Sequence, residues 1–478
     1  MNSMKPITAY LGLFALLFFC LTYAHQKKFD APTPVSRLDL LHALAVQGTV
    51  SIDAYHENTP DKAVFDGRYY SDKAPGTVAL ALLPFALAVA ALGVAGIDLG
   101  SDVGWLISSW ITSAGSVGLV TALGGVALFR WLCGHVPPRS ALLTTLALFL
   151  GAAPLPYSTM MFSHALVVGL LAIAIWAIHE STDKPTTDSS VIRAPSPPAE
   201  EGRGEGERLI ESTEVEPRTG TRSFWETAYQ ENRWELLAGF ACGWALASEY
   251  SAGLVVVGLA LWISVSGWRR LVPFSLAAIP PLLLIPAYSW ACFGDPFTLP
   301  YSYQASFPAM SEGVYAIKWP DAETAFRLLF SPARGLFFWS PFLLIAGFGY
   351  WQLMQKSTGL FWLTYAIPVL HVAVISGRVW DWPAGPAWGP RLLSPMLPLL
   401  ALPCAYGVSR FPWLSLPLAV YSILVTSVAT LTDACPPYDV HLNPLLELNV
   451  PSFRKGELSP NLGDRKSTRL NSSHRIRS

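Results

Sequence analysis

The feature that most constrains the fold of this chain is a series of apolar runs, each close to the length that a helix needs to cross a membrane. A crossing helix needs about 20 mainly apolar residues to span the hydrocarbon core. Twelve windows approach this standard, at 6–24, 75–97, 105–131, 140–156, 161–179, 235–248, 250–266, 271–292, 336–354, 359–376, 391–408 and 413–432. Only 14% of the residues are charged, against roughly 25% in soluble globular proteins. The sequence therefore predicts an all-α polytopic membrane protein with about eleven or twelve apolar helices.

Basic residues in short loops predict the orientation, because Lys and Arg are retained in the cytoplasm. Lys5 predicts a cytoplasmic N-terminus, which puts residues 25–74 outside. The clusters "FRWLCGHVPPR", with Arg130, and "GWRR", with Arg270, are predicted to face the cytoplasm. Both clusters do so only if 75–97 enters the membrane surface and returns, as its prolines and glycine allow. The prediction is eleven crossings plus this embedded segment.

The soluble stretches divide the chain into two transmembrane modules. The first module covers 1–180 and contains the large outside loop 25–74. In this loop "VSRLDLLHALAVQG" spaces its apolar residues for a short helix lying on the membrane surface. The second module covers 234–462 and contains the outside loop 293–335.

Two segments are predicted to lie outside the folded modules. Residues 181–233 are rich in Pro, Ser, Glu and Gly ("APSPPAEEGRGEGER"), which predicts a disordered cytoplasmic linker. Residues 463–478, "GDRKSTRLNSSHRIRS", look like a translated sequencing-library adapter. This tail is therefore not expected to belong to the fold.

The first outside loop concentrates the groups that suit phosphate chemistry. "FDGRYYSDKAPG" packs acids, bases and two tyrosines into twelve residues, directly before an apolar run. "SIDAYHEN" follows the predicted surface helix, so both stretches are held near the membrane plane. The alternative is a loop whose charges only keep it in water. A carboxylate and a lysine held at the membrane plane suit a reaction in which one substrate is a lipid phosphate.

The motif "YYSDKAPG", the apolar first helix and the acid after a short helix resemble the GT-C superfamily of membrane glycosyltransferases. The branch that the motifs most resemble contains the bacterial protein O-mannosyltransferases and aminoarabinose transferases. "GPRLLSPMLPLL" is similar to a G-x-R-x-L-x-P-x-x-P pattern of that branch, and the likeness in organisation covers most of residues 1–432. The resemblance implies a GT-C-like fold and transfer of a sugar from a polyprenyl phosphate to an extracytoplasmic acceptor, with inversion.

The resemblance also implies the setting of the reaction. The protein is expected in a bacterial inner membrane with its active site on the periplasmic side. Its expected partners are a polyprenyl-phosphate-linked donor, a glycan, lipid or protein acceptor, and membrane lipid, without nucleic acid. No cofactor is implied, although a divalent cation is left open. No residue of the sequence selects the sugar or the acceptor.

The resemblance assigns roles to individual residues of this chain. Asp53 is the expected catalytic base, with Glu57 and Asp61 as fallbacks. Lys73 is expected to contact the donor phosphate, and Arg391 is a second phosphate ligand or else an interfacial arginine. The remaining candidates for substrate binding are Arg37, Glu57, Tyr69, Tyr70, Asp72, His164 and Glu249. For the tyrosines the alternative is interfacial anchoring, for His164 helix packing, and for Glu249 a structural ion pair.

The physical chemistry of sugar transfer agrees with these roles. Positive charge develops on the sugar and negative charge on the departing phosphate, so a preorganised Lys or Arg stabilises the transition state. A carboxylate that accepts the acceptor's proton contributes about 10²–10⁴-fold in rate. The cysteine and histidine spacings contain no metal-ligand motif, so no metal site is predicted.

Two rival functions remain. A transporter or flippase for lipid-linked glycans would place its charges near the bilayer midplane, on broken helices in repeated halves. Here the charges concentrate in one outside loop. A non-catalytic scaffold leaves the spacing of Asp53 and Lys73 unexplained. The glycosyltransferase prediction requires that Asp53, Lys73 and Arg391 converge on one cavity.

Overall fold

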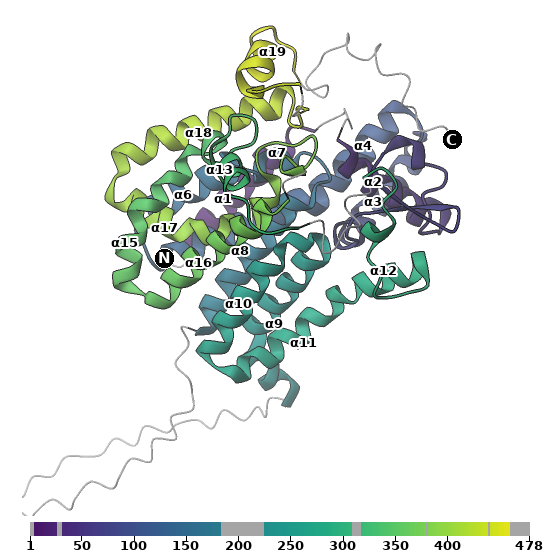
Figure 1. The fold of residues 1–478 in the computed structure, drawn as a ribbon. Coiled ribbons are helices and arrows are strands. Elements are labelled where there is room, and N and C mark those ends of the chain that lie inside the picture. The colour runs from purple at the N-terminus through teal and green to yellow at the C-terminus, as the bar shows by residue number, and fades with distance from the viewer. Residues whose placement is uncertain are drawn as a thin grey trace, which may run out of the picture.

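A computed structural model describes residues 4–25, 31–182, 224–307, 317–378, 381–437 and 440–458. Each of the twelve predicted windows contains helix (Figure 1). Within the described residues, seven helices are long and apolar enough to cross a membrane, and three apolar helices are shorter. The predicted class, an all-α polytopic membrane protein, is confirmed.

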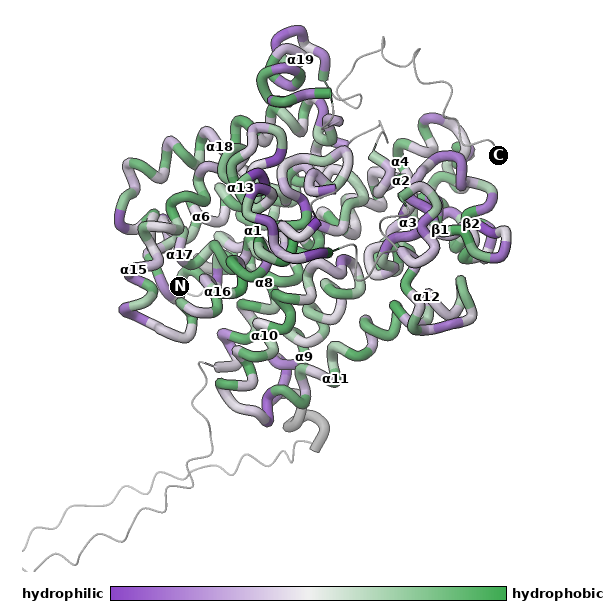
Figure 2. The backbone as a smooth tube through the Cα atoms, in the orientation of Figure 1, coloured by the Kyte–Doolittle hydropathy of each residue, from purple (hydrophilic) through white to green (hydrophobic). Residues whose placement is uncertain are grey.

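The first half of the chain contains these helices: α1 (Met4–Thr22), α2 (Pro32–His42), α3 (Gly76–Val94), α4 (Asp102–Ser113), α5 (Leu119–Cys133), α6 (Pro138–Leu150), α7 (Pro154–Ser158) and α8 (Ser163–Thr182). The second half contains α9 (Phe224–Ser248), α10 (Gly253–Ser266), α11 (Leu271–Leu282), α12 (Leu284–Phe293), α13 (Ala322–Phe330), α14 (Leu336–Trp339), α15 (Ala346–Lys356), α16 (Thr358–Ser376), α17 (Leu397–Arg410), α18 (Pro412–Thr432) and α19 (Val450–Arg454). Figure 2 shows hydrophobic residues along most helices and hydrophilic residues at connections such as the β1–β2 hairpin.

Small residues let neighbouring helices approach closely, as is common where lipid rather than water surrounds a bundle. A Cβ added at Gly349 of α15 would lie 1.7 Å from the carbonyl oxygen of Pro403 in α17. A Cβ at Gly239 of α9 would lie 1.9 Å from the carbonyl oxygen of Phe274 in α11. Glycine at these positions is therefore required by the packing of the two backbones.

Contacts between α1 and the continuous stretch α4–α5 define the two sides of the molecule. The indole nitrogen of Trp110 donates to the carbonyl oxygen of Thr22 at the end of α1 (2.9 Å). Near the beginning of α1, the ring of Tyr10 lies 6.1 Å from the ring of Phe129 in α5. The two helices are thus antiparallel, and Arg130 lies on the side of the N-terminus. We call this the N-terminal side, and the opposite side the loop side.

The predicted embedded segment 75–97 forms α3. Trp110 of α4 contacts Thr22 at the loop-side end of α1, and α4 begins eight residues earlier, at Asp102. The connection from α3 to α4 therefore lies on the loop side. The start of α3 lies there too, since a Cβ at Gly76 would be 2.6 Å from the carbonyl carbon of Ala247 near the end of α9. These contacts agree with the prediction that the segment does not cross. Of the two predicted forms of this segment, a broken helix or an interfacial one, the broken helix is wrong, because α3 is one continuous helix that includes Pro84. By length and composition alone α3 could also cross a membrane.

Side chains at the end of α8 and in α9 are joined on the N-terminal side. The Ser181 hydroxyl donates to Glu235 of α9, and Arg270 donates to the same hydroxyl (3.0 Å). Arg130 donates to Glu180 (3.1 Å). Both basic clusters therefore lie on the side of the N-terminus, as the sequence predicts.

The two segments predicted to be unfolded fall mostly outside the described residues. Of the predicted linker 181–233, residues 183–223 are not described, nor is the tail 463–478. Residues 224–233 belong to α9, so the linker prediction is wrong there. Its sequence, "FWETAYQENR", carries aromatic residues and good helix formers that continue the helix toward its N-terminus.

The first outside loop consists of a helix and a hairpin. The predicted surface helix is α2, extended by a π turn to Gln47 and ended by Gly48 at φ +70°. The strands β1 (Lys62–Phe65) and β2 (Arg68–Ser71) then pair in antiparallel register around the positive-φ turn Asp66-Gly67. Asp-Gly is a preferred pair for such a turn. The hairpin delivers Asp72 and Lys73 directly to the start of α3.

Candidate functional site

Lys73 lies between two buried carboxylates. Its Nζ is 2.8 Å from Asp61 Oδ2 and 3.2 Å from Asp72 Oδ2. The hairpin register produces this arrangement, because Lys62 pairs with Ser71 and the next residues outward are Asp61 and Asp72. The side-chain exposure is 8% for Lys73, 10% for Asp61 and 0% for Asp72. The three charges are therefore largely removed from water.

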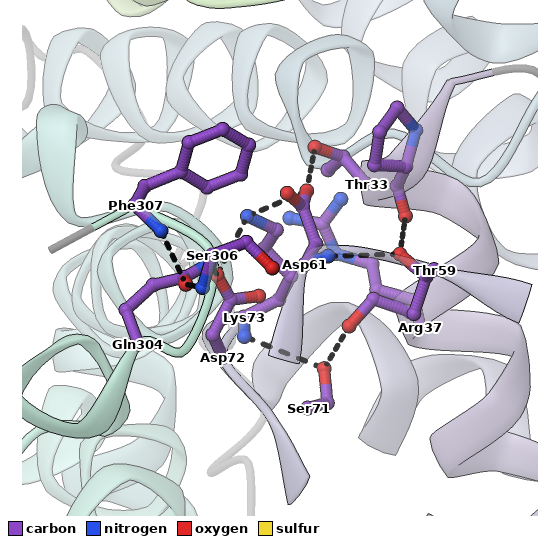
Figure 3. Close-up of polar contacts among 12 residues, drawn as sticks. Thr33, Arg37, Thr59, Asp61, Ser71, Asp72, Lys73, Gln304, Ser306 and Phe307 are labelled. Carbon is purple, nitrogen blue, oxygen red and sulfur yellow. Dashed lines mark hydrogen bonds and ion pairs between the residues drawn. The ribbon is translucent and has the colours of Figure 1, made fainter. Parts of the chain in front are cut away.

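The second outside loop closes the Asp72 side of this group (Figure 3). Gln304 Nε2 donates to Asp72 Oδ2 (3.1 Å), and Gln304 Oε1 accepts from the backbone N of Phe307 (3.0 Å). Gln304 also forms a backbone bridge to Ala63 of β1. The ring of Tyr301 lies 5.5 Å from Lys73 Nζ. The loop is thus fixed to the hairpin at the point where Lys73 emerges.

Arg391 approaches from the opposite direction. It begins the 3-10 helix Arg391–Met396 that leads into α17. Its Nη1 donates to Thr33 Oγ1 (3.3 Å), and the same hydroxyl donates to Asp61 Oδ2 (2.8 Å). The guanidinium also lies over the ring of Phe162, at 5.5 Å. Asp61 therefore has Lys73 on one side and, through Thr33, Arg391 on the other.

A second carboxylate, Glu249, forms a neighbouring polar group. It accepts from Ser163 Oγ (2.7 Å) and lies 4.0 Å from Arg37 Nη2 and 3.9 Å from His164 Nδ1. Arg37 also donates to Ser163 Oγ (2.9 Å). Arg391 interacts electrostatically with both Glu249 and Asp61. Its charge thus favours the ionised form of both carboxylates.

The buried ion pairs set the protonation of the Lys73 group. Burial alone would raise the pKa of Asp61, but the attraction of Lys73 outweighs it and holds this pKa below its usual value. Burial raises the pKa of Asp72 to about 6, against the attraction of Lys73. Burial opposes the charge on Lys73, yet Asp61 and Asp72 raise its pKa above the ordinary value. Asp61 and Lys73 are consequently charged at neutral pH.

Asp53, the base expected from the sequence, lies apart from this group. Its side chain is exposed, and Oδ1 accepts from the backbone N of Tyr69 (2.7 Å). The backbone of Ser51 to Asp53 runs beside β2, with Ile52 turned inward and fully buried. Because side chains alternate along such a strand, Asp53 points to the opposite face. The structure brings Lys73 and Arg391 together, and it does not bring Asp53 to them.

The other predicted residues of the loop have local contacts. Glu57 is exposed in a 3-10 turn. Tyr69 stacks on His56 with ring centroids 3.8 Å apart. Tyr70 is buried and packs against Phe293 at 5.5 Å. Asp72 contacts Lys73, and Arg37 and His164 lie beside Glu249 in the neighbouring group. Substrate binding by these residues stays a prediction, with the structural ion pair of Glu249 as the alternative.

Thr33 and Ser163 belong to the site and were missed by the sequence prediction. Each bridges an arginine and a carboxylate, and neither lies in a charged motif that would single it out. The position of Asp61 had a signal, because the Asp-Gly turn in "DKAVFDGRYYSDK" predicts a hairpin whose register pairs Asp61 with Asp72.

The chemistry of the group favours an anionic ligand. Within the described ranges, no three His, Cys, Asp or Glu side chains are placed together to hold a metal ion. Arg37 Nε and Arg391 Nε are buried and have no hydrogen-bond acceptor within the part of the chain that the structure describes. Donors of this kind are suited to phosphate oxygens.

Neither the comparison with protein-family models nor that with curated proteins yields a match. Among solved structures, the chain is similar to ArnT from Cupriavidus metallidurans bound to undecaprenyl phosphate, with 14% identity and a TM-score of 0.48. It is similar to the same protein in the apo state, with 14% identity and a TM-score of 0.47. Each match covers 90% of this chain and 64% of ArnT, so the chain spans less than two thirds of that protein's length.

Proposed function

We propose that this membrane protein is a glycosyltransferase that moves a sugar from a polyprenyl-phosphate donor to an acceptor on the loop side. The observation that carries the proposal is the convergence of Lys73 and Arg391, far apart in the sequence, around the buried carboxylate of Asp61. The resemblance of "YYSDKAPG" and "GPRLLSPMLPLL" to GT-C motifs supports it. We also propose that the loop side is the periplasmic side of a bacterial inner membrane, because Arg130 and Arg270 gather on the other side.

In this mechanism the donor phosphate binds to Lys73 and Arg391. The oxygen of the acceptor hydroxyl forms a bond to the anomeric carbon while the bond from that carbon to the phosphate oxygen breaks. The hydroxyl proton passes to a carboxylate, and the polyprenyl phosphate leaves with the negative charge that the two cations stabilise. A single displacement of this kind inverts the anomeric carbon.

We propose Asp61 as the carboxylate that accepts the proton. Its side chain is buried, contacts Lys73 directly and Arg391 through Thr33, and is ionised at neutral pH, so that it can accept a proton. Asp53, the base inferred from the resemblance, remains the alternative and is tested beside it. The sugar and the acceptor are not selected by any of these contacts.

The test is transfer in vitro from defined polyprenyl-phosphate sugars by the purified full chain. We expect Asp61→Asn to lower kcat by about 10²-fold or more, the usual range for losing a general base. Lys73→Gln should raise KM for the donor and lower kcat, because it removes a charge-assisted phosphate bond. Asp53→Asn should retain most of the activity, since its side chain is exposed and caps the backbone of Tyr69.

Three outcomes would contradict parts of this proposal. Full activity of Asp61→Asn together with loss in Asp53→Asn would make Asp53 the base. Transfer with retention of anomeric configuration would exclude the single displacement. Movement of donor lipid across vesicle membranes, without transfer by the wild type to any tested acceptor class, would favour the flippase.

A further inference from the structure

The two carboxylates beside Lys73 are not equivalent. Asp61 Oδ2 forms an ion pair with Lys73 and accepts a hydrogen bond from Thr33, and Arg391 stabilises its charge. Asp72 Oδ2 accepts hydrogen bonds from Lys73 and Gln304, whereas Asp72 Oδ1 is buried and has no hydrogen-bond partner among the described residues. Asp72 thus depends on Lys73 for most of the stabilisation of its charge.

The groups that face Asp72 come from several elements. They are Asp61 and Lys73 at the base of the hairpin, Arg37 of α2, Tyr250 after α9, Tyr288 of α12, and Tyr301 with Gln304 of the second outside loop. Burial raises the pKa of Tyr301 to about 12, so this phenol is neutral at physiological pH. Lys73 and Arg37 are therefore the cations facing Asp72, and Asp61 is the anion.

A phosphate on Lys73 would change this balance. Its oxygens take hydrogen bonds from the ammonium that now serves both carboxylates, and they add a further anion to the group. A like charge within about 4–6 Å raises the pKa of a carboxyl group. Asp61 keeps the hydrogen bond from Thr33 and the charge of Arg391, whereas in the described part of the chain Asp72 keeps one side-chain hydrogen bond, from Gln304.

We propose that donor binding takes up one proton, which is held by Asp72. The inference rests on the proposed function, because it assumes that the donor phosphate binds to Lys73. The proton comes from water and forms a bond to a carboxylate oxygen, for which the unpartnered Oδ1 is available. Asp61 remains ionised, so the site holds one neutral and one charged carboxyl when the donor is bound.

The position of Asp72 makes this uptake observable near neutral pH. Burial already raises the pKa of Asp72 to about 6, so the free protein holds this group mostly ionised at pH 7. An added anion moves the pKa upward through neutral pH. Proton uptake is therefore expected to be close to one at pH 7 and to fall toward zero at pH 5, where Asp72 is already protonated.

The probe is a prenyl methyl phosphodiester, bound to the purified full chain in an uncharged maltoside detergent. A phosphodiester has no proton to lose near pH 6, unlike a phosphate monoester. Titration calorimetry in buffers of different ionisation enthalpy then counts the protons taken up by the protein. We expect the Kd to rise by up to about tenfold per pH unit above pH 6, which is the linkage for one proton.

Two variants assign the proton. Asp72→Asn should bind the probe with no proton uptake and with a Kd that is flat between pH 6 and 8. Asp66→Asn is the matched control, because Asp66 lies exposed at the turn of the same hairpin, where Asn-Gly is also favoured. This control should take up as many protons as the wild type.

Binding without proton uptake by the wild type at pH 7 would overturn the inference and leave the proposed function standing. Uptake that persists in Asp72→Asn would assign the proton to another group and would also overturn it. Failure of the wild type to bind any prenyl phosphodiester contradicts the proposed function itself. The wild-type pH series does not depend on the folding of any variant.

Discussion

At the scale of single residues, the first outside loop holds, besides Asp61 and Asp72, a third buried acid that has no part in the proposed chemistry. Asp39 Oδ1 of α2 accepts a hydrogen bond from Asn58 (3.1 Å), and Oδ2 is buried without a hydrogen-bond partner among the residues described. Burial raises the pKa of Asp39 to about 8. The group is thus neutral in the folded protein at pH 7 and ionised in the unfolded chain.

This difference predicts how stability depends on pH. Between about pH 4 and pH 8 the folded state binds more protons than the unfolded state, so Asp39 lowers the free energy of unfolding as pH rises through that window. The slope is at most about 1.4 kcal/mol per pH unit. Asp39→Asn removes this penalty, and its Tm relative to the wild type should increase from pH 5 to pH 8. Thermal unfolding in detergent measures the effect.

The exposed Asp66→Asn serves as control and should shift Tm equally at both pH values. A constant loss of Tm in Asp39→Asn across the range would mean that Asp39 is ionised in the folded protein.

The charged residues of the site show what a sequence can and cannot predict. Lys73 was predicted as a site residue from its motif, and the register of the hairpin could have indicated that Asp61 lies beside it. Asp53 was preferred because it follows the surface helix, but that criterion ignores the alternation that turns Ile52 inward and Asp53 outward. Thr33 becomes functional only through a contact with Arg391, which no local pattern encodes.

At the scale of elements, the helices were predictable because apolar length is a local property. Their junctions were less so. The start of α9 within the predicted linker and the unbroken course of α3 through Pro84 both depend on how neighbouring segments pack. A proline can be accommodated inside a helix at membrane depth when neighbouring groups satisfy the freed backbone.

The close contact of α15 with α17 leads to a prediction. Gly349→Ala places a methyl group 1.7 Å from the carbonyl oxygen of Pro403, so the helices must move apart. Such overpacking costs about 1–3 kcal/mol, and we expect a lower Tm in detergent. Gly347, two residues away in the same helix, has nothing within 4 Å of an added Cβ.

Gly347→Ala is therefore the matched control, and its higher helix propensity should raise stability by up to about 1 kcal/mol. Equal effects of the two substitutions would show that α15 and α17 are not in backbone contact.

At the scale of the whole molecule, the two sides defined by α1 and α5 predict which residues are accessible from outside a cell. Asp66→Cys in the hairpin and Ala95→Cys after α3 should react with a membrane-impermeant maleimide on intact cells. Lys356→Cys, exposed at the end of α15, should react only after permeabilisation. The labelling of the parent chain, which has six cysteines, is the background.

Opposite labelling of Ala95→Cys and Asp66→Cys would show that α3 crosses the membrane.

The meeting of Lys73 with Arg391 also belongs to this scale. This meeting could be predicted only through the resemblance to a family, because a contact between two distant segments leaves no periodic pattern in the sequence of either segment.

The joining of α8 to α9 through Ser181 and Glu235 has a practical consequence. The chain leaves the bundle at Thr182 and returns at Phe224, which lies 11 residues before Glu235 and therefore about 16 Å along α9 from this contact. A rigid reporter domain that replaces residues 183–223 thus needs termini separated by about that distance if neither helix is to be strained. Such a fusion would give a small, featureless membrane particle an asymmetric handle by which single molecules can be aligned in electron micrographs.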